Sequence, residues 1–221
     1  MTKSDDPILV RLANRVGVIG LLMLVVPSLL AAWVYQGDAD ESFSFLTHTL
    51  SELGRYDTST LAVLVNGGLF FGGLALVLCF SSQAWIRRDA PLTVSLHISG
   101  VLLALSVAAC GLFPVNVGPL HSKAMTAFYL MTPICAVIYC FAILTELPPR
   151  WGVLPAMAAA GCALLLLLDP ERDLMLMDRY AFGQFGAERP AIWWPALTGW
   201  LLLLFVGIWL LYVLVLVRRQ Q

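Results

Sequence analysis

Six long apolar segments constrain the fold of this chain more than any other feature. Each has about 18 residues or more, the length that a helix needs to cross a hydrocarbon layer about 30 Å thick. They cover residues 16–36, 61–84, 92–113, 123–146, 151–168 and 196–217. Lipid offers the backbone no hydrogen-bond partner, so each segment should be helical. The sequence therefore predicts an all-α, polytopic membrane helix bundle with six transmembrane helices, in a single integral membrane domain over residues 1–221.

The composition excludes several classes of protein. Hydrophobic residues make up 60% of the chain and charged residues only 12%, whereas soluble domains carry about a quarter charged residues. With a net charge of −1 and two lysines, the chain lacks the basic patch that nucleic-acid binding requires. All five cysteines lie in apolar segments without Cys-x-x-Cys spacing, so we expect no disulfide framework, no metal and no cofactor.

Basic residues are distributed unevenly between the two sides that six spans would define. The side with both termini carries eight of the 13 Lys and Arg residues against four carboxylates, a net charge of +4, and the opposite side has a net charge of −5. Cytoplasmic segments are enriched in Lys and Arg, which predicts that both termini are cytoplasmic. The two long links, after the first and fifth spans, then lie outside. We expect an integral membrane protein with this orientation.

The outer link after the first span contains an amphipathic pattern at residues 43–54, FSFLTHTLSELG. At 100° per residue its apolar and polar residues separate onto two faces, which predicts a short interfacial helix. His48, Ser51 and Glu52 would then project together from the polar face. These side chains either solvate the outer face of the helix or form half of a functional site.

A second group of polar residues is predicted at the same membrane level. Asn66 lies near the outer end of the second span, where it either bridges two helices or contributes to the site, and the Gly68–Gly72 spacing favours a close helix approach. His121 falls in the first turn of the fourth span, after the link GLFPVNVGP. A helix N-terminus favours an anionic group such as a lipid phosphate.

These residues define one candidate site with two sets of roles. His48, Ser51, Glu52 and His121 are predicted to face one outer cavity as candidate catalytic residues. The candidate substrate-binding residues around them are Asp57, Asn66, Asn116, Ser122 and Lys123. The alternative for His121 is a hydrogen-bonded surface residue, and Ser122 and Lys123 could simply cap the helix or extend to the interface.

The segments THTLSELG, VNGGLFFGG and GLFPVNVGPLHSKAM together resemble a bacterial membrane family, domain of unknown function 998. The resemblance is strongest over residues 40–130. The layout is also similar to the Frag/Sfk-type six-span proteins, a group linked to lipid remodelling. The family resemblance implies a six-span topology and a site at Ser51, Glu52, Asn66 and His121. This chain has Asn116 at a position where many relatives are expected to have an acidic residue.

Two functions follow from this pattern. The first is an outward-facing protein that binds a lipid or a lipid-linked headgroup as a lipid-binding, transport or accessory subunit. Its partners would be membrane lipid and a partner membrane protein. The alternative is a membrane-embedded lipid hydrolase or transferase, in which His48 or His121 acts as general base, Ser51 as nucleophile and Glu52 or Asp57 as the orienting group. The sequence lacks the Gly-x-Ser-x-Gly and His-Glu-x-x-His patterns and does not decide between the two.

Overall fold

The computed structural model describes residues 7–37, 41–86, 88–89, 91–145, 150–169 and 189–216, and within these ranges it contains helices and no strands. The long helices are α1 (Pro7–Val34), α3 (Ala62–Ile86), α4 (Pro91–Leu112), α5 (Pro119–Thr145), α6 (Val153–Leu168) and α8 (Trp194–Leu211). The short ones are α2 (Leu50–Leu53), the 3-10 turns η1 (Val115–Val117) and η2 (Arg150–Gly152), and the π-helical turn η3 (Tyr212–Leu216).

The long helices confirm the predicted polytopic membrane bundle. Within the described part of the chain, five of them are long and apolar enough to cross a membrane. The remaining predicted span corresponds to α6, which is apolar but has only 16 residues, or about 24 Å at 1.5 Å per residue.

Helix α1 begins earlier than the apolar segment that predicted it. The predicted span starts at residue 16, whereas the helix starts at Pro7. Proline is well suited to the first position of a helix because its missing N–H has no intrahelical partner there. Arg11 and Arg15 are exposed and are good helix formers, so the helix continues into the polar region beyond the apolar segment.

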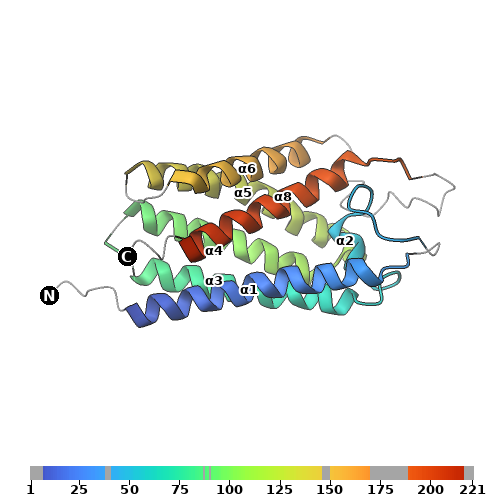
Figure 1. Ribbon diagram of the computed structural model, residues 1–221, viewed down its shortest axis with the longest axis horizontal. Coiled ribbons are helices and arrows are strands. Elements are labelled where there is room, and N and C mark those ends of the chain that lie inside the picture. The colour runs from blue at the N-terminus through green and yellow to red at the C-terminus, as the bar shows by residue number, and fades with distance from the viewer. Residues whose placement is uncertain are drawn as a thin grey trace.

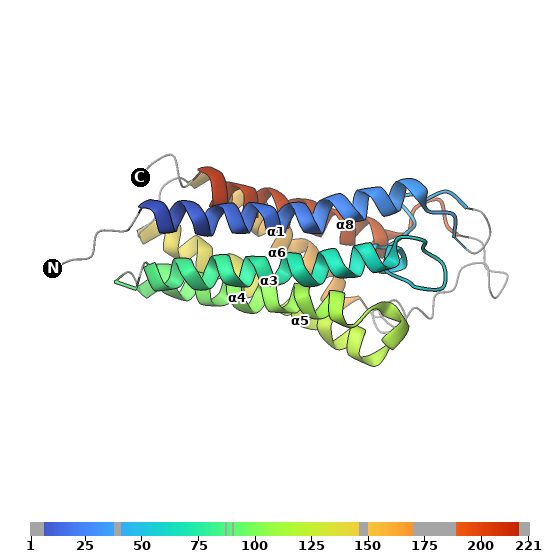
Figure 2. The ribbon, with the colours of Figure 1, turned by 90° about the horizontal axis from the view of Figure 1, so that it is seen from below.

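The long helices pack in sequence order around an almost closed ring. Helix α1 packs on α3, α3 on α4, α4 on α5, α5 on α6, and α6 on α8, whereas α8 and α1 barely touch. The two views of the bundle show the helices running side by side along one long axis (Figures 1 and 2). The ring therefore has one seam, between its first and last helices.

Glycines permit the closest contacts in the ring. A Cβ on Gly68 would lie 2.4 Å from the carbonyl oxygen of Met23, and one on Gly72 would lie 2.7 Å from that of Gly20. Both distances are far below van der Waals contact. The predicted close helix approach at Gly68–Gly72 is therefore observed, and the helix that approaches is α1.

The predicted amphipathic helix over residues 43–54 is wrong in its extent. The structure has turns followed by the single helical turn α2, which begins after Thr49. Thr49 is an N-cap in extended conformation, and its side chain and that of Glu52 form a reciprocal capping box. Because an N-cap residue has non-helical dihedral angles, the preceding residues, including His48, lie outside the helix.

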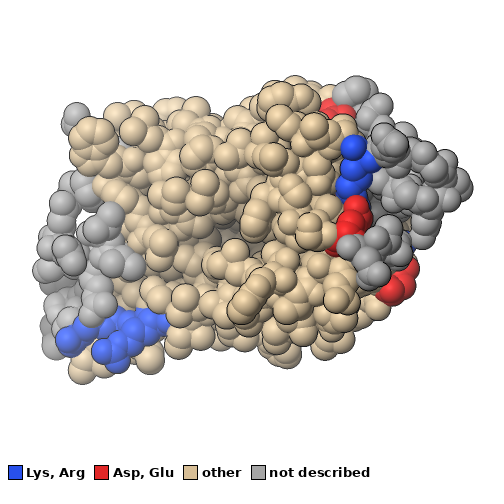
Figure 3. Space-filling model, turned by 45° about the vertical axis from the view of Figure 1, so that its right-hand side comes forward, with Lys and Arg blue, Asp and Glu red and all other residues tan. Residues whose placement is uncertain are grey.

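Charged side chains occur at the two ends of the visible face and are absent from the broad surface between them (Figure 3). This is the pattern expected of a bundle with an apolar belt in lipid. The N-terminal end of α1 and the C-terminal end of α8 lie at one end of the bundle, and α2 lies at the other (Figure 1). We refer to the latter as the α2 end.

Candidate functional site

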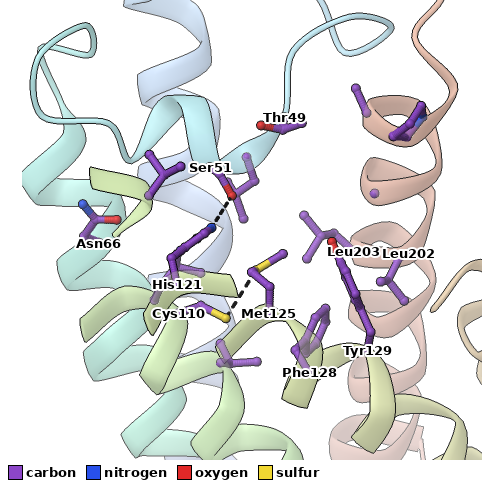
Figure 4. Close-up of a pocket in the computed structure, with 17 residues that line it drawn as sticks. Thr49, Ser51, Asn66, Cys110, His121, Met125, Phe128, Tyr129, Leu202 and Leu203 are labelled. Atoms are coloured by element: carbon purple, nitrogen blue, oxygen red, sulfur yellow. Dashed lines mark hydrogen bonds between the residues drawn. The ribbon is translucent and has the colours of Figure 1, made fainter. Parts of the chain in front are cut away.

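The most reactive arrangement at the α2 end is a hydrogen bond between a serine and a histidine from distant parts of the chain. Ser51 Oγ lies 3.0 Å from His121 Nε2, and Figure 4 shows the two side chains pointing toward each other from α2 and α5. His121 Nδ1 lies 2.8 Å from the carbonyl oxygen of Phe113. A carbonyl can only accept, so Nδ1 carries the proton in the neutral ring and Nε2 is left to accept the Ser51 hydroxyl proton.

The link between α4 and α5 explains the position of His121. Pro114 precedes the short turn η1, and Gly118 has a φ of +51°, a conformation that glycine adopts readily. The chain thereby reverses, and Pro119 starts α5 at its first position. This places His121 in the first turn of α5, as predicted, and brings its ring against Phe113, the first residue of the link.

The Ser51–His121 pair faces a cavity of about 80 Å³, measured as the space that the centres of water molecules could occupy. Its wall has a small polar part, formed by Ser51, His121, Asn66 and Thr49, and a larger apolar part (Figure 4). The apolar part includes Leu69, Val107, Met125, Phe128, Leu202 and Leu203. Such a wall suits a molecule with one polar group and a hydrocarbon portion.

Asn66 supports the polar part of the wall by fixing the loop beyond α2. Its side-chain amide donates a hydrogen bond of 2.7 Å to the carbonyl oxygen of Gly54. A Cβ on Gly54 would lie 2.5 Å from Asn66 Oδ1, so only glycine permits this approach. Gly54 has a φ of −89°, which shows that the close approach, rather than a left-handed backbone, requires the glycine.

The structure does not place His48 and Glu52 at this cavity. His48 is buried, and its Nδ1 accepts hydrogen bonds from the backbone N–H of Ser44 at 3.2 Å and from Thr47 Oγ1 at 3.0 Å. The proton therefore lies on Nε2, which faces Glu41 Oε1 at 3.4 Å. His48 therefore holds its own loop together through these contacts. The predicted single cavity shared by all four candidate catalytic residues is not observed.

Glu52 belongs to a second polar cluster, centred on Arg189, which sequence reasoning did not select. Arg189 Nη2 donates to Glu52 Oε2 at 2.7 Å and to Glu41 Oε1 at 3.0 Å, and its Nε donates to Glu41 Oε2 at 3.0 Å. Its Nη1 donates to the carbonyl oxygen of Thr47 at 3.0 Å. We call Arg189, Glu41, Glu52, Thr47 and His48 the Arg189 cluster.

Electrostatics in the Arg189 cluster favour the charged form of Glu41. Partial burial alone would raise the pKa of its carboxyl, but the hydrogen bonds and positive charge of Arg189, with a smaller contribution from His48, lower the pKa below its ordinary value. Glu52 Oε1 also accepts from the Thr49 backbone N–H at 2.8 Å. The cluster therefore joins three segments, the loop at Glu41, helix α2 and the start of the last described segment.

The remaining candidate binding residues lie away from the cavity. Asn116 accepts a hydrogen bond from the backbone N–H of Tyr56 at 3.1 Å and donates one of 3.2 Å to Asp57 Oδ1. Asp57 also accepts a hydrogen bond from Arg55 Nε at 2.9 Å. Partial burial alone would raise the pKa of the Asp57 carboxyl, but its hydrogen bonds outweigh burial and lower the pKa. Both side chains thus join two exposed loops.

Ser122 and Lys123 complete the set of predicted binding residues, and neither lines the cavity. Ser122 is buried, and Lys123 is exposed. Within the described ranges, no group of three or more His, Cys, Asp or Glu side chains is arranged to hold a metal ion.

The fold and the site define a polytopic helical membrane protein with a Ser–His pair beneath one end of its bundle. The family model described as "Protein of unknown function (DUF998)" matches residues 23–170, which extends the resemblance seen over residues 40–130 in both directions. The chain belongs to this family. The match includes both members of the Ser–His pair and ends before Arg189. No curated protein and no solved structure matches the chain.

Proposed function

We propose that this protein is a membrane-embedded serine hydrolase or acyltransferase that acts on a lipid ester. The observation that carries the proposal is the Ser51–His121 hydrogen bond of 3.0 Å at the wall of a mostly apolar cavity. A serine hydroxyl is a weak nucleophile until an adjacent base takes its proton. The tautomer of His121 fixed by the Phe113 carbonyl presents that base at Nε2.

The two residues divide the chemistry between them. Ser51 Oγ attacks the ester carbonyl carbon as His121 Nε2 takes the hydroxyl proton. The bond between the carbonyl carbon and the lipid alcohol then breaks, and the alcohol leaves with the proton from His121. Water, or the hydroxyl of an acceptor lipid, attacks the acyl-Ser51 ester in the reverse sequence and restores the serine. The Phe113 carbonyl orients the imidazole in the position that a carboxylate occupies in other serine hydrolases.

A second candidate is lipid binding without chemistry, as a transport or accessory subunit that works with a partner membrane protein. The specific observation in its favour is that His121 Nδ1 is held by a neutral carbonyl and not by a carboxylate. A carbonyl stabilises the imidazolium less than a charged partner does. In this candidate, Ser51 Oγ keeps its own proton on His121 Nε2 and accepts a hydrogen bond from a hydroxyl or amide group of the lipid headgroup.

An activity assay on purified protein separates the two candidates. Phospholipid ester hydrolysis in mixed micelles should be lost in Ser51→Ala and in His121→Ala. Ser106→Ala is the matched control, because Ser106 is also buried, donates only to the Leu103 carbonyl and does not line the cavity. Hydrolysis that persists in Ser51→Ala, or that is absent from the unmodified protein while lipid binding is present, would favour the second candidate.

We also propose that the α2 end faces outward and that both termini are cytoplasmic, in the inner membrane of a bacterium. Support comes from the +4 and −5 charge asymmetry of the links and from the shared end of the bundle at which α1 begins and α8 ends (Figure 1). Reporter fusions at Arg88 and Gln221 should report the cytoplasm, and a fusion at Glu171 the outside. An outside signal at Gln221 would contradict this orientation.

A further inference from the structure

A second, larger cavity of about 340 Å³ lies along the seam of the bundle. Residues of α1, α3, α4, α5 and α8 line it, and nearly all of them are apolar. The polar groups in its wall have partners within the protein, since Ser28 Oγ donates to the Leu24 carbonyl and Trp200 Nε1 donates to the His48 carbonyl. The wall of this cavity therefore offers mainly hydrocarbon contacts, and these two donors are already used within the protein.

This cavity, which we call the seam groove, lies directly beside the Ser51–His121 cavity. The same five apolar side chains line both: Leu50, Leu69, Val107, Phe128 and Leu203. Leu50 directly precedes Ser51 in α2. A hydrocarbon chain in the seam groove would thus have one end beside the reactive pair.

The seam groove is long enough for an extended hydrocarbon chain. Along α3 its wall runs from Leu69 to Phe80, which corresponds to about 17 Å at 1.5 Å per residue. That is more than half of a hydrocarbon layer about 30 Å thick. Because α3 runs along the bundle (Figure 2), a chain in this groove lies parallel to the helices, as lipid tails do.

The seam groove opens sideways, toward the surface that lipid covers. Leu29 of α1 and Leu204 and Ile208 of α8 line it and are 53%, 54% and 44% exposed. Helices α1 and α8 barely touch, so no tight helix contact closes the entrance. The apolar surface in Figure 3 is hollowed between the two charged ends. A lipid tail could enter without leaving the hydrocarbon layer.

From this geometry we infer that the substrate is a long-chain acyl lipid, which enters laterally between α1 and α8 with its tail in the seam groove and its ester carbonyl at Ser51. The inference rests on the proposed function for the identity of the reacting bond. The tail stays in the groove while the lipid alcohol leaves, and after the acyl-Ser51 ester is hydrolysed the fatty acid returns to the bilayer by the same route. Leu50 and Phe128 set the boundary between tail and reacting group.

Photo-cross-linking tests the groove independently of turnover. The probe is a phosphatidylcholine with a diazirine in its palmitoyl chain, in phosphatidylcholine nanodiscs that contain the full chain. Gly207→Phe should block the groove, because Gly207 lines it and a Cβ there meets no atom within 4 Å. Gly161→Phe is the control, since Gly161 has the same open surroundings but lines neither cavity.

We expect cross-links to concentrate on groove residues such as Leu204, and to fall about ten-fold or more in Gly207→Phe but not in Gly161→Phe. Equal labelling of all lipid-exposed helix faces, unaffected by Gly207→Phe, would overturn the inference. Protection of the groove by a second copy of the chain, detected as a cross-linked dimer across α1 and α8, would overturn it as well.

Ester hydrolysis separates failure of this inference from failure of the proposed function. Gly207→Phe should lower the rate on p-nitrophenyl palmitate relative to the rate on p-nitrophenyl butyrate, because the short chain does not reach the groove, whereas Gly161→Phe should leave this ratio unchanged. Equal rates of Gly207→Phe and Gly161→Phe on p-nitrophenyl palmitate would contradict lateral entry while leaving the serine chemistry intact. Groove labelling without any Ser51-dependent hydrolysis would confirm the tail site and contradict the proposed function.

Discussion

The α2 end contains two polar clusters that use neighbouring residues for different purposes. In the Arg189 cluster both carboxylates are held by the guanidinium, and Glu52 also accepts the N-cap N–H. The Ser51–His121 pair has one hydrogen bond between its members and one orienting bond to the Phe113 carbonyl, and it faces a cavity. A cluster whose charges are all paired stabilises the fold, whereas a hydroxyl–imidazole pair beside open space can act on a ligand.

Ser51 and Glu52 show how closely the two clusters are interleaved. The residues are adjacent in α2, and successive helical residues point about 100° apart. Ser51 therefore faces α5, while Glu52 faces Arg189. One helical turn thus carries a catalytic candidate on one side and its structural anchor on the other, and substitutions in the two clusters should have separable effects.

The largest effect should come from His121→Ala. Loss of a general base typically lowers the rate about 10²–10⁴-fold, whereas the lost hydrogen bonds cost about 1 kcal/mol of unfolding free energy each. Activity on a phospholipid ester and thermal unfolding in the same detergent measure the two quantities. A fall in activity that only follows the folded fraction would show that His121 has a structural role. The Ser51–His121 pair would then not differ in purpose from the Arg189 cluster.

Arg189→Gln should show the opposite pattern. It leaves Glu41 and Glu52 without their cation, and at carboxylates that are 32% and 11% exposed we expect a loss of about 2–3 kcal/mol in the free energy of unfolding. Activity per folded molecule should fall far less than in Ser51→Ala. Unchanged stability in Arg189→Gln would mean that the cluster does not anchor the loop.

Gly54→Ala tests the contact between Asn66 and Gly54, the residue that follows α2. Helix α2 carries a member of each cluster, Ser51 and Glu52. The added methyl group would displace the Asn66 amide from the Gly54 carbonyl, with a cost of about 1–3 kcal/mol for overpacking. Gly161→Ala is the control, because its Cβ meets no atom within 4 Å and alanine favours a helix by about 0.5–1 kcal/mol over glycine. Equal unfolding temperatures for the two variants would show that Asn66 can move away at no cost.

The smallest effect concerns pH and the Arg189 cluster. The lowered pKa of Glu41 means that its contribution to stability is complete above its ordinary value of about 4.5 and is lost as the pH falls through the folded-state value. The unmodified protein should therefore lose more thermal stability than Glu41→Gln when the pH is lowered below about 4.5. Identical pH profiles would exclude a stabilising role for the Glu41 carboxylate.

The helical bundle could be predicted from the sequence because lipid imposes a simple rule on long apolar segments. The position of His121 was also predictable, since Pro114 and Pro119 mark the end of one helix and the start of the next. The extent of helix α2 was not predicted. Periodicity extended the helix back to Phe43, whereas the Thr49–Glu52 capping box starts it at Leu50.

The composition of the site was only partly predictable, because its contacts join residues that are far apart in the sequence. Ser51 and His121 were selected, but 70 residues separate them and no local pattern shows that they touch. Arg189 was missed although Glu41 and Glu52, in the link after the first span, require a cation. The sequence contains three arginines between the fifth and sixth spans, Arg172, Arg179 and Arg189, and only the tertiary structure shows that Arg189 reaches both carboxylates.

The most direct test of the Ser51–His121 account is covalent labelling of the purified protein with a fluorophosphonate, followed by peptide mass spectrometry. The reagent phosphonylates serine hydroxyls that an adjacent base activates. We predict a single modified serine, Ser51, with labelling that is abolished in His121→Ala and retained in Arg189→Gln and Ser106→Ala. Labelling at another serine, or labelling of Ser51 that is unchanged in His121→Ala, would contradict the assignment of His121 as the base and of Ser51 as the nucleophile.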